Sequence, residues 1–489
     1  MAQRLTLANA GALLPYDRSR VTPGIVHLGI GAFFRSHAAV YLDSVLKEDP
    51  SWGVIGASLK RPDTRNALLP QDFLYTLAVR SAAGTDTRVI GSLLDVLDAT
   101  AQRDALLDAM ADPRVRIVSL TITEKGYCHD PATGKLDLNH PDIRHDLAHP
   151  ESPVSAAGLI VRALELRRMR NVKPFTVLCC DNQPANGETV GRIVTAFARE
   201  RDAALGDHVA REVSFPSTMV DRIVPATTDE DRALVREATG LDDAWPVMTE
   251  PFCQWVVEDR FPSGRPALEG LGVEMVEDVR PFEFMKLRML NGSHSTLAYL
   301  GYLAGYEYVS QAMANADYRS LIHGLMTEEV MATLPMERHA LTRYRDALLE
   351  RFTNPALKHR TWQIAMDGSQ KLPQRLLGTI RDRLARGLPV ARLSLGVAAW
   401  MRYVTGEDES GNAIDVRDPL AERLKAIGAA ARRNPVALVD GLLQVKEVFG
   451  EDLGRNAILR SHVSGHLASL FDHGAKQTVA SLVGGLPKS

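Results

Sequence analysis

The first half of the chain alternates short apolar runs with longer stretches that carry apolar residues at helical spacing. Residues 25–30 (IVHLGI) are apolar almost throughout, and the glycines Gly29 and Gly31 close the run. Strands that are buried on both faces of a sheet show this continuous apolar pattern. A helical stretch follows from about residue 35 to residue 46. Three other runs of the same kind are residues 52–59 (WGVIGASL), 115–122 (VRIVSLTI) and 175–180 (FTVLCC).

Strand and helix in alternation predict right-handed crossovers and a parallel sheet. After about residue 279, strand-like alternation almost disappears and long segments carry apolar residues at helical spacing. We therefore predict an α/β fold: a Rossmann-like, doubly wound domain over residues 1–279, then a mostly α-helical domain over residues 280–489. The helical segments expected in the second domain are residues 291–303, 318–331, 393–403, 435–448 and 457–471.

Composition narrows the class of protein. A chain of 489 residues exceeds what one hydrophobic core usually supports, which agrees with two domains. The 45% of hydrophobic and 24% of charged residues exclude disorder, collagen and coiled coil as the main architecture. A net charge of −3 offers no field for nucleic acid or an anionic membrane. No apolar run approaches the ~18 residues that span a bilayer, and no secretory signal is recognisable.

The four cysteines indicate neither disulfides nor a metal. Cys179 and Cys180 are adjacent, which is a poor geometry for a mutual disulfide. The chain has no C-x-x-C pair and no H-E-x-x-H motif, so zinc has little support. We expect a cytoplasmic protein without metal, as a monomer or a small homo-oligomer.

A glycine-rich turn (GIGAFFR, residues 29–35) follows the first strand and opens a helix. In this context backbone N–H groups can approach a pyrophosphate at a helix N-terminus, although Phe34 stands where G-x-G-x-x-G has its third glycine. The alternative is a plain strand-to-helix turn. The residues expected to contact a nicotinamide dinucleotide are Gly29, Ile30, Gly31, Ala32, Phe33 and Arg35.

The end of the second strand leaves the phosphorylation state of the cofactor open. An acid at this point normally binds the ribose 2′-OH of NAD. Here Lys60 and Arg61 come first and Asp63 follows, so the two cations either meet the 2′-phosphate of NADP or form a solvated turn.

Residues 282–294 (FEFMKLRMLNGSH) hold the most informative polar cluster. On an α-helix Glu283, Lys286, Asn291 and His294 fall within an arc of roughly 140°. A lysine in an apolar site loses hydration of its charged form and can act as a base near neutral pH. The alternative is an amphipathic helix whose polar residues face water. None of the 11 tyrosines is followed by lysine in a Tyr-x-x-x-Lys pattern, so lysine is the best-placed general base.

A second polar run, residues 180–187 (CDNQPANG), follows a predicted buried strand at its carboxyl end. Doubly wound folds build their sites there. An ordinary Asn/Pro/Gly loop is the alternative.

Together these segments resemble the polyol-specific long-chain dehydrogenase/reductase family, which contains the mannitol dehydrogenases. The similarity covers nearly the whole chain and includes the Lys286-x4-Asn291-x2-His294 array. It implies that residues 1–279 bind the dinucleotide and that residues 280–489 form the substrate and catalytic domain. It also implies NAD-dependent, metal-independent hydride transfer with Lys286 as general acid/base. It further implies that Asn182 and Asn291 hold the reacting oxygen, that His294 positions substrate, and that Glu283 exchanges protons with solvent. The other matching blocks are GIGAFFRSH (29–37), TITEKGY (121–127), CDNQPANG (180–187) and MVDRIVP (219–225), the last containing Asp221 on the cofactor side.

Within this family the chain most resembles the fructuronate reductases (D-mannonate oxidoreductases), through residues 359–377, 396–406 and 411–419. Mannitol dehydrogenases tend to carry arginine where this chain has Gln363. We therefore expect a sugar-acid substrate, with D-mannonate and D-fructuronate interconverted by NAD while NADP stays open. The alternatives are mannitol 2-dehydrogenase activity and a nicotinamide-binding regulator without catalysis.

The carboxylate of such a substrate needs a cation. If residues 359–371 are helical through Gly368, then Arg360, Gln363, Asp367 and Lys371 lie within a stripe of roughly 80°. The stripe either faces solvent or turns Lys371 or Arg360 toward the substrate carboxylate.

Overall fold

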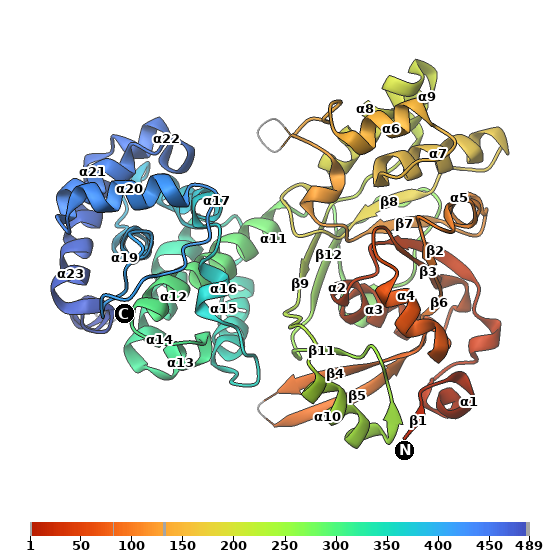
Figure 1. Ribbon diagram of the computed structural model, residues 1–489, viewed down its shortest axis with the longest axis horizontal. Helices are drawn as coiled ribbons and strands as arrows, with labels where there is room; N and C mark the ends of the chain where they lie inside the picture. The colour runs from red at the N-terminus through yellow and green to blue at the C-terminus, as the bar shows by residue number, and fades with distance from the viewer. Residues whose placement is uncertain (1, 82, 131–133, 486–489) are drawn as a thin grey trace. The chain divides into compact units, whose positions relative to one another are not determined.

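The computed structural model describes residues 2–81, 83–130 and 134–485 (Figure 1). The chain divides into two compact units, Met1–Arg280 and Pro281–Ser489, called here the N-terminal and C-terminal units.

The N-terminal unit is built on a five-stranded parallel sheet of order β6-β3-β2-β7-β8, which confirms the predicted Rossmann-like architecture. Val26 in the middle of the sheet pairs with Ile55 on one side and with Val118 on the other. Strand order reverses between β2 and β7, the point at which doubly wound folds bind ligands. The strands are β2 (Pro23–Leu28), β3 (Gly53–Ser58), β6 (Leu93–Asp98), β7 (Ile117–Leu120) and β8 (Thr176–Cys179).

Helices cover both faces of this sheet. Alternate strand residues point to opposite sides, and because both sets are apolar, each face needs a layer of helices to bury it. Val26 and Leu28 pack into a core with α5, α7 and α8, whereas Ile25 packs into a second core with α3. The expected helix over residues 35–46 is two helices, since His37 has non-helical dihedral angles. The helices of this unit are α1 (Leu7–Ala10), α2 (Ala32–Ser36), α3 (Ala38–Val45), α4 (Asp63–Leu68), α5 (Arg103–Ala111), α6 (Pro141–Ala148), α7 (Ala156–Met169), α8 (Asn186–Arg201), α9 (Ala203–Glu212) and α10 (Asp229–Thr239).

Smaller sheets complete the unit. One has the order β11-β4-β5 and another the order β13-β12-β9, while β1 and β10 form a two-stranded parallel pair. Their strands are β1 (Gln3–Arg4), β4 (Tyr75–Ser81), β5 (Gly84–Ile90), β9 (Thr218–Asp221), β10 (Leu241–Asp242), β11 (Val247–Thr249), β12 (Gln254–Glu258) and β13 (Glu274–Val276).

The C-terminal unit is helical, and its described residues form no strand. α12 (Gly292–Leu303) and α19 (Ala391–Tyr403) are buried along almost their whole lengths and pack against each other. α23 (Ala457–Gly485) packs on α19 and bends at Gly474. The other helices are α11 (Arg280–Met285), α13 (Val309–Ala314), α14 (Ala316–Gly324), α15 (Arg338–Thr353), α16 (Thr361–Ala365), α17 (Gly368–Leu372), α18 (Gly378–Leu384), α20 (Ala421–Ala431), α21 (Pro435–Leu443) and α22 (Lys446–Gly454).

The described part of this unit contains three π-helical segments, η7, η8 (Leu325–Val330) and η10, and the first and last of them change the expected geometry. η7 (Lys286–Asn291) joins α11 to α12, and η10 (Pro373–Leu377) joins α17 to α18. Pro373 lacks an N–H and its ring crowds the preceding turn, which explains why the helix widens at η10. A π-segment has more residues per turn than an α-helix, so the arc predicted from regular α-helical spacing around Lys286 does not hold.

The predicted continuous helix through Gly368 is wrong. α16 ends at Ala365 and α17 starts at Gly368, with Asp367 between them in the left-handed region at φ 55°. The stripe calculated for Arg360 to Lys371 therefore has no helical basis.

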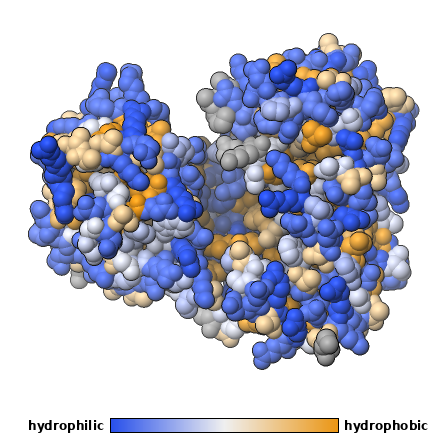
Figure 2. All heavy atoms as spheres, viewed as in Figure 1, coloured by the Kyte–Doolittle hydropathy of each residue, from blue (hydrophilic) through white to orange (hydrophobic). Residues whose placement is uncertain are grey.

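Surface character agrees with the composition. In the view of Figure 2 the face of each unit is mostly hydrophilic, with apolar residues scattered among polar ones. Among the described residues no helix combines the length and apolarity needed to cross a bilayer.

Candidate functional site

The glycine turn joins β2 to α2 and requires its first glycine. Gly29 has φ 94°, and a Cβ there would lie 2.2 Å from the carbonyl oxygen of Thr121. Gly31 caps α2 without a side-chain hydrogen bond, and the nearest atom to a Cβ built on it is 4.0 Å away. The space beside Gly31 is thus uncrowded. This geometry fits the pyrophosphate of a dinucleotide.

A buried histidine, His27, holds this turn in place through hydrogen bonds and a ring contact. His27 places Nε2 2.9 Å from Thr121 Oγ1 and Nδ1 2.8 Å from Ser119 Oγ, and its ring stacks 3.5 Å from that of Phe34. Thr121 Oγ1 in turn donates to the carbonyl of Gly29 at 2.7 Å. Burial lowers the pKa of His27 to about 3, so the ring is neutral. Sequence reasoning treated His27 only as part of an apolar strand.

The other residues expected to contact the cofactor differ in their surroundings. Ile30 is buried, while Ala32 and Phe33 are half-buried beside the turn. Arg35 is buried, and its Nη1 donates to the carbonyl of Trp245 at 2.6 Å. That guanidinium therefore holds α2 to the segment that precedes β11. Asp221 is buried at the end of β9, where its backbone pairs with Gln254.

The loops after β7 and β8 are tied together by Asp181. Its carboxylate accepts the backbone N–H groups of Ile122 at 3.0 Å and Thr123 at 2.9 Å, as well as the hydroxyl of Tyr127. Burial raises the pKa of Asp181 above the usual aspartate value. The next residue, Asn182, is exposed at the carboxyl end of the parallel sheet.

Asn186 fixes the other end of the same loop. Its Nδ2 donates to the carbonyls of Asp181 and Thr218, both at 3.0 Å, and its Oδ1 accepts the N–H of Thr218 at 2.9 Å. The polar run at residues 180–187 is therefore a braced loop that presents Asn182. The sequence motif indicated the loop but did not distinguish bracing residues from presented ones.

The lysine cluster lies on one continuous helical stretch through α11, η7 and α12. Lys286 opens η7 with 8% of its surface exposed, and Asn291 closes η7 half-buried. Glu283 is half-buried on α11, and His294 is buried on α12. π-Segments inside helices often occur at functional sites. The structure thus brings Glu283, Lys286, Asn291 and His294 onto one element.

His294 lies in a confined setting. Its ring centroid is 4.6 Å from that of Phe352 and 4.9 Å from that of His359, the second ring being nearly perpendicular. Burial, with the nearby charges of Arg351 and Arg375, holds the pKa of His294 well below its usual value. Its buried Nε2 has no hydrogen-bond partner among the described residues. A neutral imidazole with a spare nitrogen can bind a substrate hydroxyl.

The two expected carboxylate-binding cations have local contacts. Lys371 Nζ donates to the carbonyl of Met366 at 2.6 Å, and burial lowers the pKa of this ammonium. Arg360 is exposed and lies 3.6 Å from Glu307. A third cation, which sequence reasoning missed, is Arg375 in η10, whose Nη1 donates to Ser295 Oγ at 3.2 Å.

One group of possible metal ligands assembles in the described part of the N-terminal unit. Ligand atoms of Cys128, His140 and Asp142 lie within 4.8 Å of one another. Nδ1 of His140 already accepts the N–H of Asp142 at 3.2 Å, and burial raises the pKa of Cys128 to about 11. A protonated thiol and a partly occupied imidazole are poor metal ligands.

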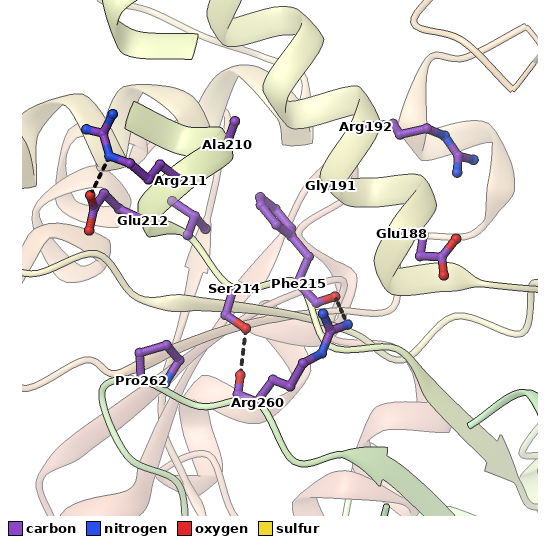
Figure 3. Close-up of a pocket in the computed structure, with 11 residues that line it drawn as sticks. Glu188, Gly191, Arg192, Ala210, Arg211, Glu212, Ser214, Phe215, Arg260 and Pro262 are labelled. Atoms are coloured by element: carbon purple, nitrogen blue, oxygen red, sulfur yellow. Dashed lines mark hydrogen bonds and ion pairs between the residues drawn. The ribbon is translucent and has the colours of Figure 1, made fainter. Parts of the chain in front are cut away.

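A surface cavity of about 640 Å³ adjoins α8 and α9 (Figure 3). Three of its charged side chains have ionic partners: Arg211 donates to Glu212 at 2.8 Å, and Arg260 pairs with Glu258. Ser214 Oγ donates to the carbonyl of Arg260 at 2.6 Å. None of the predicted cofactor or catalytic residues lines this cavity.

Comparison with known proteins agrees with this organisation. The family model described as the mannitol dehydrogenase Rossmann domain matches residues 23–270, and that of the mannitol dehydrogenase C-terminal domain matches residues 278–471. The D-mannonate oxidoreductase of Escherichia coli K12 is 47% identical over 473 residues, covering 96% of this chain and 97% of that protein. Another protein of that strain, the uncharacterized oxidoreductase YdfI, is 48% identical over 97% of this chain and 98% of its own.

A solved structure is similar over the full length. The mannitol 2-dehydrogenase of Pseudomonas fluorescens, in a ternary complex with NAD and D-mannitol, has a TM-score of 0.85 and 38% identity, covering 99% of this chain and 100% of that one. With both family models matched in order and these relatives spanning nearly the whole chain, the protein belongs to the mannitol dehydrogenase family of oxidoreductases.

Proposed function

We propose that the protein is an NAD-dependent oxidoreductase that interconverts D-mannonate and D-fructuronate without a metal. The observation that carries the chemistry is the element from Glu283 to His294, which places a buried lysine, an amide and a neutral histidine on one helical stretch. The choice of substrate is supported by the 47% identity to a D-mannonate oxidoreductase.

The turn at residues 29–35 is where the chain would hold the cofactor. The uncrowded space beside Gly31, with Ile30, Ala32 and Phe33 next to it, suits a pyrophosphate. When bound there, the cofactor would supply a hydride acceptor (NAD) for oxidation of the substrate carbinol carbon and a hydride donor (NADH) for reduction of the ketone carbon. The P. fluorescens relative is a complex with NAD, which supports NAD here. Lys60 and Arg61, exposed after β3, offer charge to a 2′-phosphate and favour NADP instead.

Side chains of the protein itself transfer the proton that accompanies the hydride. In reduction, protonated Lys286 delivers a proton from Nζ to the ketone oxygen; in oxidation, neutral Lys286 removes the hydroxyl proton. Amide donors from Asn182 and Asn291 would stabilise negative charge on the same oxygen. His294 would orient a neighbouring hydroxyl through its spare Nε2, and Glu283 would return the lysine proton to solvent.

A second candidate is mannitol 2-dehydrogenase activity. It is favoured by the similarity to the P. fluorescens structure, whose ligand is D-mannitol. Gln363, which stands where mannitol dehydrogenases tend to have arginine, argues against it.

Product identification tests the proposal. The enzyme is incubated with NADH and D-fructuronate, and the six-carbon product is separated by chromatography against D-mannonate and L-gulonate standards. D-Mannonate as the product supports the proposal. No consumption of NADH, or L-gulonate as the product, refutes it.

A further inference from the structure

Arg375 is a half-buried guanidinium without an acidic partner. In the part of the chain that the structure describes, its only hydrogen bond goes from Nη1 to Ser295 Oγ at 3.2 Å, and it forms no salt bridge. Arg381, one helix further on, instead pairs with Asp452 at 2.6 Å. A cation withdrawn from water without a counter-ion is costly, so this position suits an anion that arrives with a ligand.

Among the described residues, two buried histidine nitrogens close to Arg375 also have no hydrogen-bond partner. They are Nε2 of His294 and Nδ1 of His359, whose rings lie 4.9 Å apart and nearly perpendicular. The positive charge of Arg375 lowers the pKa of both rings. Arg375 also donates to Ser295, the residue that follows His294 in α12. Buried polar atoms in native proteins are normally satisfied. Three groups from three segments thus have unused hydrogen-bonding capacity in one neighbourhood.

The charges around this neighbourhood are mainly positive. Burial lowers the pKa of His294 and the pKa of His359, the latter to about 4, and Arg351 and Arg375 lower both further, so both rings are neutral near pH 7. Lys371 also lies near Arg375. The nearby acids are occupied: Asp367 lies 4.0 Å from Lys371 Nζ, and Asp418 accepts the N–H and hydroxyl of Ser369. A negatively charged group beside Arg375 would therefore be close to positive charges and to hydrogen-bond donors.

We propose that Arg375, with His359 beside it, binds the carboxylate of the sugar-acid substrate and so distinguishes a sugar acid from a polyol. This inference rests on the proposed function and adds the residue that selects the substrate class. A guanidinium can bind a carboxylate through two parallel hydrogen bonds, a geometry that an ammonium does not offer. Lys371 and Arg360 suit the role less well. The ammonium of Lys371 already donates to the backbone carbonyl of Met366, and Arg360 is exposed and lies near the carboxylate of Glu307.

A matched pair of substrates isolates this contact. D-Fructuronate is D-fructose with the terminal hydroxymethyl group oxidised to a carboxylate, so the two differ only at the group that Arg375 would bind. kcat/KM with NADH is measured for both in the wild type, Arg375→Gln, Arg375→Lys and the control Arg381→Gln. We expect Arg375→Gln to lose about 10- to 100-fold on D-fructuronate while its rate on D-fructose stays near the wild-type value. Arg375→Lys should fall between, and Arg381→Gln should leave the ratio unchanged.

The outcomes separate the two proposals. Equal losses on both substrates, or no loss on D-fructuronate, overturn the carboxylate contact while the proposed function stands. A wild type that does not reduce D-fructuronate refutes the proposed function, and the contact with it. If thermal melting shows that Arg375→Gln does not fold, Arg375→Lys decides, because it keeps the charge and the aliphatic stem but cannot form the two-pronged bond.

Discussion

Replacing Lys286 removes the group to which the account assigns proton transfer. We choose Lys286→Met because the side chain is 8% exposed and lies at the start of η7. Methionine keeps an unbranched apolar stem of similar length, so packing around Met285 and Met289, both buried neighbours in sequence, is retained. The substitution therefore tests chemistry and leaves the fold largely unchanged.

The expected loss follows from two terms. General acid–base catalysis contributes about 10²–10⁴-fold, or about 3–5 kcal/mol of barrier. A positioned ammonium near the developing alkoxide adds electrostatic stabilisation that methionine cannot supply. The turnover number in Lys286→Met should thus fall by at least two orders of magnitude.

The assay is the steady-state rate of D-fructuronate reduction by NADH, followed at the nicotinamide absorbance. The affinity for NADH, measured by its fluorescence, should remain near the wild-type value. The turn at Gly29–Arg35 belongs to the N-terminal unit, whereas Lys286 belongs to the C-terminal unit. The control Lys446→Met removes an exposed lysine that pairs with Glu451 and should leave the rate unchanged. Retention of more than about a tenth of the wild-type turnover would refute Lys286 as acid/base.

Three further predictions concern metal, cofactor and pH. Dialysis against a strong chelator should leave activity intact, because the chemistry is assigned to Lys286 and the Cys128/His140/Asp142 group has poor ligands; activity lost and restored only by zinc would contradict this. NADH should give a higher kcat/KM than NADPH; if NADPH is preferred instead, Lys60→Ala should shift the ratio back toward NADH. Burial lowers the pKa of His27 to about 3, so this ring stays neutral in the folded protein, whereas in the unfolded chain it takes up a proton below about pH 6.5. The free energy of unfolding should therefore decrease as the pH is lowered below about 6.5, by up to about 1.4 kcal/mol per pH unit for this group. Urea unfolding from pH 7 to pH 5 measures that slope, which should be shallower in His27→Gln; an identical slope in both proteins would contradict the assignment.

The parallel sheet was predictable because its strands are buried on both faces, and the runs around Ile25, Val54, Val118 and Val177 are accordingly apolar. The strand β6 escaped notice because Asp95 and Asp98 interrupt its apolar pattern. Sheet order and the small sheets around β4 and β9 depend on pairing between distant residues, which periodicity does not report.

Prediction of the candidate site was limited by backbone irregularities. The Lys286, Asn291 and His294 positions were recognisable from residue types and spacing, but the π-geometry of η7 was not, because π and α segments have similar apolar patterns over a few residues. The left-handed Asp367 broke a helix that the polar stripe assumed. Arg375 reads in sequence as an ordinary solvated arginine, and only its burial and lack of an acidic partner distinguish it.

The central claim is that a sugar acid is the substrate. It is tested most directly by comparing kcat/KM for the wild type with D-fructuronate, D-tagaturonate, D-fructose and D-mannitol, each with its reduced or oxidised nicotinamide. We predict that D-fructuronate with NADH gives the highest kcat/KM. If D-fructose or D-mannitol is turned over more efficiently than D-fructuronate, this prediction is contradicted and the activity is that of a mannitol 2-dehydrogenase.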